Sequence, residues 1–214
     1  MRNGVATAAL IAVHETPSAN VGICSAIASI ALHPREELDA RLLPVRDALD
    51  QVPRRAIEIA VKDGIRMHVL AISERYTAVS PTLERRGIDV DAWPVPPAGI
   101  FVMEERTVYV RSTSPVTIVH EFAHGLDCAM GGGVYRSGYD HGVGEAFRRA
   151  SSFVTPYAAV SIDEYFAECF RAYVEVNEPG FLWPDVTRER LALHAPEMLS
   201  WFDREIGLDK ASLT

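Results

Sequence analysis

Between residues 36 and 62, apolar side chains recur every three or four positions, as they do along one face of a helix. Pro44 and Pro53 interrupt this pattern, and proline disfavours a helix interior because it removes a backbone donor. The pattern therefore predicts two helices, the first broken near Pro44 and the second beginning after Pro53. The dipeptide Asp63-Gly64 is a turn signal that ends this helical region.

The same spacing predicts three more helices further along the chain. One begins at Ser114-Pro115, a capping residue followed by proline at the first helical position. It is expected to run to about Met130, where three consecutive glycines end it. The other two cover residues 161–176 and 196–206.

Strand signals are fewer and lie between these helical regions. Residues 65–72 are expected to form a strand, and residues 101–103 and 107–111 alternate across a Glu-Glu-Arg turn, the pattern of a hairpin. Proline and glycine are concentrated in residues 80–99, which predicts an ordered but irregular loop. We therefore expect an α+β fold, mainly helical, with a small β-sheet whose hairpin borders a cleft.

The length of 214 residues suits one main domain, which we place at residues 36–214. Residues 1–35 are apolar and form a separable segment of uncertain role. Within it, Arg2 and the apolar stretch 4–13 resemble a short signal peptide, although no clean small-x-small cleavage site follows. We favour a soluble, cytoplasmic protein, with secretion as the alternative. No apolar run reaches the roughly eighteen residues that cross a bilayer.

Charge and cysteine content narrow the function further. The net charge of −8 comes from mixed acidic and basic residues, so the chain has no basic stripe that would neutralise phosphates, and nucleic acid is not expected as a partner. Cys24, Cys128 and Cys169 fit neither a disulfide framework nor a thiolate zinc site. We interpret them as small buried residues.

The main chemical signal is the H-E-x-x-H motif formed by His120, Glu121 and His124 in the middle of the helix predicted over 115–130. The two histidines lie one helical turn apart, so their imidazoles project from one face and can bind a single metal ion. Glu121 is offset by one position and can reach a water beside that ion. Zinc suits this set because it takes imidazole and carboxylate ligands and leaves one position open. A chance match of five residues is the alternative.

A hydrolytic zinc site usually needs a third protein ligand. The metzincin continuation requires glycine at position 127 and histidine at position 130, but the chain has Asp127 and Met130, which excludes that class. Asp127 lies three residues after His124 on the same helix, where we expect it to orient a neighbouring group. His141, in a glycine-rich loop, is an alternative ligand.

Glu164 is the favoured third ligand. It lies four residues before Glu168 on one face of a helix that is otherwise rich in aromatic and apolar residues. Two carboxylates on a half-buried face need positively charged or hydrogen-bonding partners, because an unpaired buried charge is costly. Zinc would compensate Glu164, and the free ring nitrogen of a ligand histidine would compensate Glu168. In the alternative interpretation, Ser161 and Glu164 form a capping box and Glu168 is a solvated charge.

Two blocks of the chain resemble a known family. Residues 120–127 (His-Glu-Phe-Ala-His-Gly-Leu-Asp), Tyr157, and residues 164–170 (Glu-Tyr-Phe-Ala-Glu-Cys-Phe) resemble the catalytic domain of anthrax lethal factor and the related bacterial Pro-Pro endopeptidases. The resemblance extends more loosely over residues 38–206 and does not cover residues 1–35. It implies a zincin-like fold of the gluzincin type.

The resemblance also implies roles for individual residues. The first block would supply the two zinc-binding histidines and the catalytic glutamate, and Glu164 would be the third zinc ligand. Tyr157, at the matching offset, would assist at the substrate oxygen, although a tyrosine in an apolar stretch is ordinarily a packing residue. Glu168 matches the second glutamate of the family. The loop over residues 131–152 departs from the family pattern, so substrate specificity cannot be carried over.

The sequence therefore predicts a zinc metalloendopeptidase acting on peptide or protein substrates, with Zn²⁺ as its cofactor. In this reaction Glu121 is the general base and Tyr157 steadies the oxyanion. One alternative from another class is a non-catalytic, metal-braced binding module or toxin component. A second is a zinc hydrolase that acts on something other than peptides.

Overall fold

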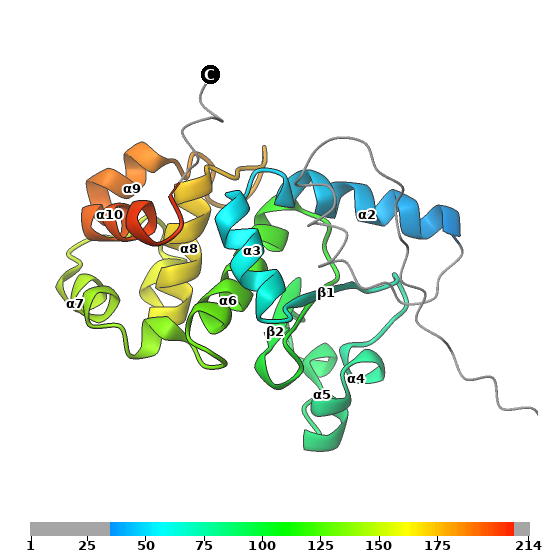
Figure 1. Cartoon of the computed structure of the whole chain (residues 1–214). Helices are drawn as coiled ribbons and strands as arrows, with labels where there is room; N and C mark the ends of the chain where they lie inside the picture. Colours follow the sequence, from blue (N-terminus) through cyan, green and yellow to red (C-terminus); the bar gives the residue numbers. More distant parts are fainter. Residues whose placement is uncertain (1–34, 208–214) are drawn as a thin grey trace, which may run out of the picture.

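The computed structural model describes residues 35–207, so the expected N-terminal segment and Cys24 lie outside the described residues, apart from Arg35. Figure 1 shows a mainly helical molecule with a small sheet. The helices are α2 (Arg35–Leu49), α3 (Arg54–Lys62), α4 (Tyr76–Val79), α5 (Pro81–Arg86), α6 (Pro115–Met130), α7 (His141–Arg149), α8 (Ile162–Val174), α9 (Arg188–His194) and α10 (Pro196–Glu205). The strands are β1 (Arg66–Val69), β2 (Gly99–Val102) and β3 (Thr107–Val110).

The three strands form one mixed sheet in the order β1-β3-β2. β1 is parallel to β3, and β2 pairs antiparallel with β3 in the predicted hairpin. Side chains on β3 alternate between two apolar clusters. Val108 and Val110 face the main core, whereas Tyr109 packs in a smaller cluster with Leu70 and Tyr76. Both faces of β3 are therefore covered, and β2 is an edge strand.

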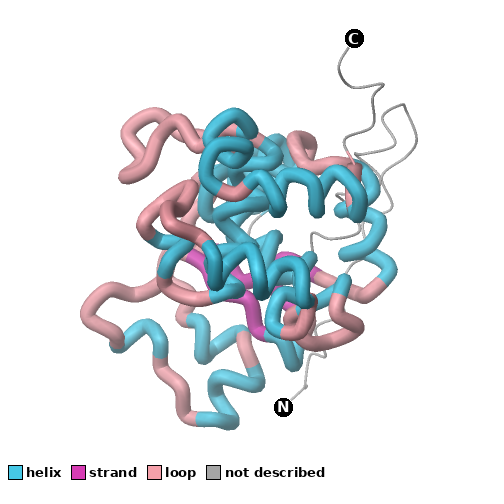
Figure 2. The backbone as a smooth tube through the Cα atoms, turned by 90° about the vertical axis from the view of Figure 1, so that its left-hand side faces the viewer, coloured by secondary structure: helices cyan, strands magenta, loops and turns pink. Residues whose placement is uncertain are grey.

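Helix α6 lies at the centre of the fold. It packs against α2, α3, the strands β2 and β3, and α8, and most of its side chains are buried. Gly125 permits the close approach to the sheet, because a Cβ atom there would lie 3.0 Å from Cγ2 of Ile65. In Figure 2 helices surround the strands, which run through the middle of the molecule.

The C-terminal helices hold α8 in place. α8 packs against α6 on one side, and α7, α9 and α10 also contact it. Phe166, Phe170, Trp201 and Phe202 form a group of edge-on aromatic contacts between α8 and α10. These contacts hold α8 against α10, while α8 also packs on α6, and α6 and α8 carry the residues of the predicted site.

Several sequence predictions require correction. α2 runs without interruption through Pro44, so the predicted break is absent. Residues 80–99 are not simply irregular, because they contain α5 and a 3₁₀ turn (Val90–Ala92). Ser114 precedes α6 as predicted, but its hydroxyl makes no capping bond and donates instead to Glu178.

Other expectations are confirmed. The hairpin and the bounds of α6 match the sequence, and α8 and α10 end within two residues of the predicted positions. Cys128 and Cys169 are buried and free. Across residues 35–207, no helix is both long enough and apolar enough to span a bilayer.

Candidate metal centre

Two helices bring three potential ligand atoms together. His120 and His124 project from α6, and Glu164 projects from the first turn of α8. The Nε2 atoms of the histidines lie 3.3 Å apart, and Oε2 of Glu164 lies 3.0 Å from the first and 3.5 Å from the second. These three residues form the one group of metal-binding type found among the described residues.

The triangle has the dimensions of a tetrahedral zinc site. Ligand atoms about 2.0–2.1 Å from a tetrahedral zinc ion lie about 3.3 Å from one another. Oε2 of Glu164 is buried and has no hydrogen-bond partner of good geometry within the described part of the chain. A buried carboxylate oxygen without a donor is costly, and a cation between the three atoms would satisfy it. The three residues therefore fit a zinc ion.

The backbone and the side chain of Glu164 have separate roles. Its backbone N–H donates to the hydroxyl of Ser161 at 3.4 Å, so Ser161 is the N-cap of α8. The Glu164 side chain does not fold back on the helix start as a capping box would require, but points towards the histidines. Burial opposes ionisation of this carboxyl, yet the two adjacent imidazoles outweigh it and lower the pKa of Glu164.

Glu168 orients His120 by contacting its Nδ1 atom. Its Oε1 lies 2.9 Å from Nδ1 of His120, and its Oε2 accepts a hydrogen bond from Thr155 at 2.7 Å. Burial alone would raise the pKa of Glu168, but contact with His120 and with Arg171 lowers it by more, so the pKa lies below its usual value. The carboxyl is therefore ionised and can only accept hydrogen bonds. Nδ1 of His120 is therefore the donor to Glu168, and Nε2 is the ring nitrogen that faces the three-atom site.

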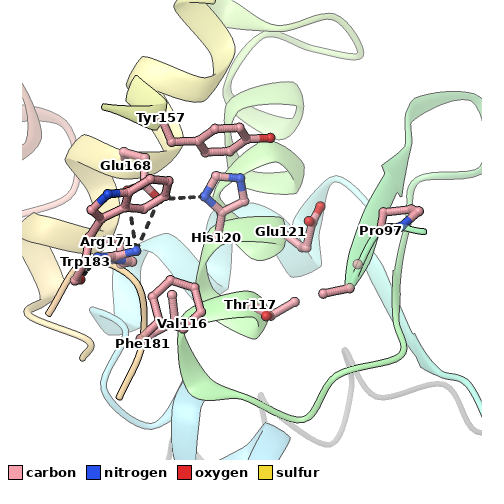
Figure 3. Close-up of a pocket in the computed structure, with 12 residues that line it drawn as sticks. Pro97, Val116, Thr117, His120, Glu121, Tyr157, Glu168, Arg171, Phe181 and Trp183 are labelled. Carbon is pink, nitrogen blue, oxygen red and sulfur yellow. Dashed lines mark hydrogen bonds and ion pairs between the residues drawn. The ribbon is translucent and has the colours of Figure 1, made fainter. Parts of the chain in front are cut away.

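A cavity of about 280 Å³ opens beside these groups. Glu121 lines it together with His120, and Figure 3 shows the Glu121 carboxylate directed into the space between α6 and Pro97. Burial raises the pKa of Glu121 despite the two neighbouring histidines. A basic carboxylate beside a metal site is suited to accept a proton from water.

Gly99 determines how closely the edge strand can approach Glu121. A Cβ atom at Gly99 would lie 2.6 Å from Cγ of Glu121 and 3.2 Å from Cγ2 of Thr117. The start of β2 therefore passes directly over the Glu121 side chain, and no larger residue fits there without displacing it. This contact places the predicted hairpin at the border of the cavity.

Tyr157 lies on the His120 side of the site. Its hydroxyl donates to Oε1 of Glu164 at 3.0 Å, and its ring centroid lies 5.6 Å from that of His120. Burial, together with the nearby Glu164, raises the pKa of Tyr157, so the phenol keeps its proton and remains a donor. The ring also stacks on Trp183, which lines the same cavity.

A second tyrosine lies on the His124 side. The ring of Tyr135 is 5.9 Å from that of His124 and 6.3 Å from that of Phe101 on β2. The segment that carries Tyr135 is attached to α6 by Asp127, whose two oxygens accept from the backbone N–H of Ser137 at 2.8 Å and from its hydroxyl at 2.5 Å. Asp127 thus orients the segment that follows α6.

The remaining candidate ligand is not part of the three-atom group. His141 begins α7, its side chain is 87% exposed, and its Nε2 lies 3.9 Å from Oε1 of Glu145. Sequence reasoning did not identify Tyr135, Trp183 or Gly99 as members of the site. Nothing in local spacing links them to the motif, because each reaches the site through the tertiary fold. The motif residues and both glutamates, in contrast, had a helical spacing that could be followed.

Comparison with known proteins finds similarity in structure but no match in sequence. No family model and no curated protein matches the sequence. Among solved structures, the fold is similar to that of the Pro-Pro endopeptidase PPEP-2 from Paenibacillus alvei, with a TM-score of 0.60. The similarity covers 85% of this chain and 98% of the other, at 17% sequence identity. The neighbour supports the predicted α+β fold, mainly helical with a small sheet, and at this identity it shows the fold alone.

Proposed function

We propose that this chain is a zinc-dependent endopeptidase. The observation that carries the proposal is the triangle of His120, His124 and Glu164 ligand atoms, with Glu121 beside it in the same cavity. A purely structural zinc site is closed by four protein ligands, whereas three protein ligands beside a cavity are typical of catalytic sites. The similarity in fold to a Pro-Pro endopeptidase favours a peptide bond as the target.

The residues divide the chemistry between them. When bound, zinc would supply a Lewis-acid centre that polarises a carbonyl group and acidifies a water molecule. Glu121 would take the proton from the attacking water and deliver it to the leaving amine, a transfer favoured by its raised pKa. The Tyr157 hydroxyl would turn from Glu164 to the substrate carbonyl oxygen as negative charge develops there. Glu168 would keep His120 in the tautomer that binds the metal.

The decisive variant is Glu121→Gln, which keeps the shape of the side chain and removes its basicity. We expect it to hold about one zinc ion per chain and to lose peptide cleavage by at least roughly a hundredfold, the lower range for general-base catalysis. Zinc content is measured by elemental analysis, and cleavage by mass spectrometry on a mixed peptide library. Glu58→Gln, an exposed glutamate on α3, is the matched control. Cleavage at the wild-type rate by Glu121→Gln would exclude the general base.

Ligand variants test the metal site separately. His124→Ala and Glu164→Ala are each expected to lose zinc, because the remaining two ligands cannot complete the site. Zinc retained by Glu164→Ala at wild-type affinity would return His141 or Asp127 as the ligand to examine. If the wild-type protein binds zinc but cleaves no peptide in the library, the metal-braced binding module becomes the better description.

A further inference from the structure

The segment between α8 and α9 is fixed at both of its ends. The Asn177 side chain donates to the carbonyl of Val186 and accepts from the N–H of the same residue, both at 2.9 Å. Val186 is fully buried in the main core. Residues 177–186 therefore form a closed loop whose ends are held together, and the loop extends from a rigid base.

A defined turn directs this loop towards the site. The N–H of Phe181 donates to the carbonyl of Glu178 at 3.2 Å, and Gly180 has a φ of 83°. With Pro179 at the second position, this is the geometry and sequence of a type II turn. The Glu178 side chain accepts a hydrogen bond from Ser114, which immediately precedes α6. The loop is thus attached to the helix that carries the H-E-x-x-H motif.

Trp183 is held by its backbone against the floor of the cavity. Its carbonyl oxygen accepts a hydrogen bond from the guanidinium of Arg171 at 3.0 Å. Arg171 is 1% exposed and also contacts Glu168, the partner of His120. This anchor leaves the indole ring free to face the cavity, which it lines together with Phe181.

The indole ring of Trp183 stacks on Tyr157. The ring centroids are 6.2 Å apart, and the planes differ by 13°. Figure 3 shows the indole, the phenol and the His120 imidazole grouped on one side of the cavity. Tyr157 itself lies in a single 3₁₀ turn (Tyr157–Ala159) and is 38% exposed, so its own element restrains its side chain little. The stack restrains the ring in addition to the hydrogen bond that the hydroxyl donates to Glu164.

We propose that Trp183 is a positioning residue for Tyr157, holding the phenol where its hydroxyl meets Glu164 and the reacting carbonyl. This inference rests on the proposed peptidase function for its catalytic consequence, and on the ring geometry for the contact itself. It assigns a task to a loop that is anchored at Arg171, Ser114 and the core. It also predicts that the contribution of Tyr157 to turnover depends on a residue 26 positions away.

Kinetics of four variants test the catalytic consequence. An aromatic pair contributes about 0.5–1.5 kcal/mol, so Trp183→Ala is expected to lower kcat roughly twofold to tenfold, with KM changing less. Trp183→Phe keeps a ring in place and should restore most of the loss. In the Tyr157→Phe background, Trp183→Ala should lower kcat no further, because the hydroxyl that it positions is already absent.

The matched control is Leu182→Ala, which truncates the neighbouring side chain in the same loop, 75% exposed to solvent. It should cleave at the wild-type rate. A Trp183→Ala variant with unchanged kcat and raised KM would show that the indole only lines the cavity. Losses that simply add in the double variant would likewise overturn the positioning role.

A second measurement tests the contact without reference to activity. Protein labelled with 5-fluorotryptophan should give three ¹⁹F resonances, one for each tryptophan, and Trp183→Phe identifies the one of interest. Tyr157→Leu removes the stacked ring and should shift that resonance while leaving those of Trp93 and Trp201 in place. An unmoved Trp183 resonance would overturn the proposal. This result decides the contact even if the protein cleaves no peptide.

Discussion

Gly99 and Glu121 are distant in sequence but lie in contact in the structure, and this contact limits where the side chain of Glu121, the proposed general base, can lie. The backbone of β2 lies over Cγ of Glu121, so the side chain cannot move towards the strand. A catalytic group displaced by about 1 Å can lose as much as roughly a hundredfold in rate. The glycine is therefore a requirement of the site.

Gly99→Ala should lower kcat by roughly tenfold to a hundredfold, because the added methyl group would displace Glu121 from the attacking water. Zinc content should stay at the wild-type value, since the three ligands do not contact the new methyl group. Steady-state kinetics and elemental analysis measure the two quantities. Gly138→Ala is the control, because nothing lies within 4 Å of a Cβ atom there. Equal kcat values for the two variants would contradict the assigned contact.

At the residue scale, the candidate ligands can be predicted from the sequence because their spacing along each helix places them on one face. A four-residue interval places His120 above His124, and another places Glu164 above Glu168. Each pair could be placed on one face of its helix before any fold was known. Tyr135 and Trp183 carry no such signal, since their neighbours are set by the way loops return to the helices.

Among the elements, the predictions succeeded where burial and local signals agree. α6 begins with Ser114-Pro115 and ends at glycine, and its bounds were predicted accordingly. α2 continues through Pro44 because Val45 and Leu49 beyond it belong to the same buried face. Burial of that face outweighs the cost of a proline in a helix interior, about 3 kcal/mol.

The short helices were missed for a different reason. α5 carries complete boundary signals, with Ser80 as N-cap, Pro81 at the first position and Gly87 in the left-handed region at the end. In the sequence these signals lie among many other prolines and glycines, a composition that favours a loop. Six residues are too few to show the apolar periodicity that would indicate a helix. Leu83 of α5 packs in the smaller core cluster, which only the tertiary fold reveals.

The segment after α6 depends on one buried carboxylate. Burial raises the pKa of Asp127 to about 6, although the Ser137 hydrogen bonds act against this. The folded protein therefore binds a proton at Asp127 more tightly than the unfolded chain does. The stability contributed by this group is present at low pH and is lost as the pH rises from about 4 through about 6.

Asp127→Asn should remove this pH dependence while keeping hydrogen bonds to Ser137. The difference in unfolding free energy between Asn and wild type should increase in favour of Asn by about 2–3 kcal/mol between pH 4 and pH 7. Urea denaturation of the zinc-free proteins across that range measures it. Using the difference cancels the opposite contribution of carboxyls such as Glu105, whose pKa is lowered. A difference independent of pH would contradict the raised pKa.

For the whole molecule, the proposed ion would link two helices, α6 and α8, that already pack against each other. α6 belongs to the part that packs on the sheet, and α8 belongs to the part that packs on the C-terminal helices. From the sequence only the fold class could be predicted, α+β with a hairpin beside the cleft, and not how the helices pack around the sheet. The division into a segment at residues 1–35 and a domain at residues 36–214 stays a prediction.

Zinc should stabilise the folded chain strongly. At a free concentration about a thousandfold above the Kd, a ligand that binds only the folded state adds about 4 kcal/mol, which corresponds to roughly 10 °C in Tm for a domain of this size. Differential scanning calorimetry with zinc or with a chelator measures this shift. His124→Ala should unfold at the same temperature in both conditions. A zinc-dependent shift of wild-type size in His124→Ala would place the ion elsewhere.

The same triangle of ligand atoms has a consequence for how the protein opens. Two of its corners belong to α6 and the third to α8, so an ion held there would act as a reversible cross-link across some 40 intervening residues. Any fluctuation that separates the two helices must first release it. Slow metal exchange and slow amide hydrogen exchange in both helices would then share one opening step. The rate of zinc loss would therefore report how often α6 and α8 separate.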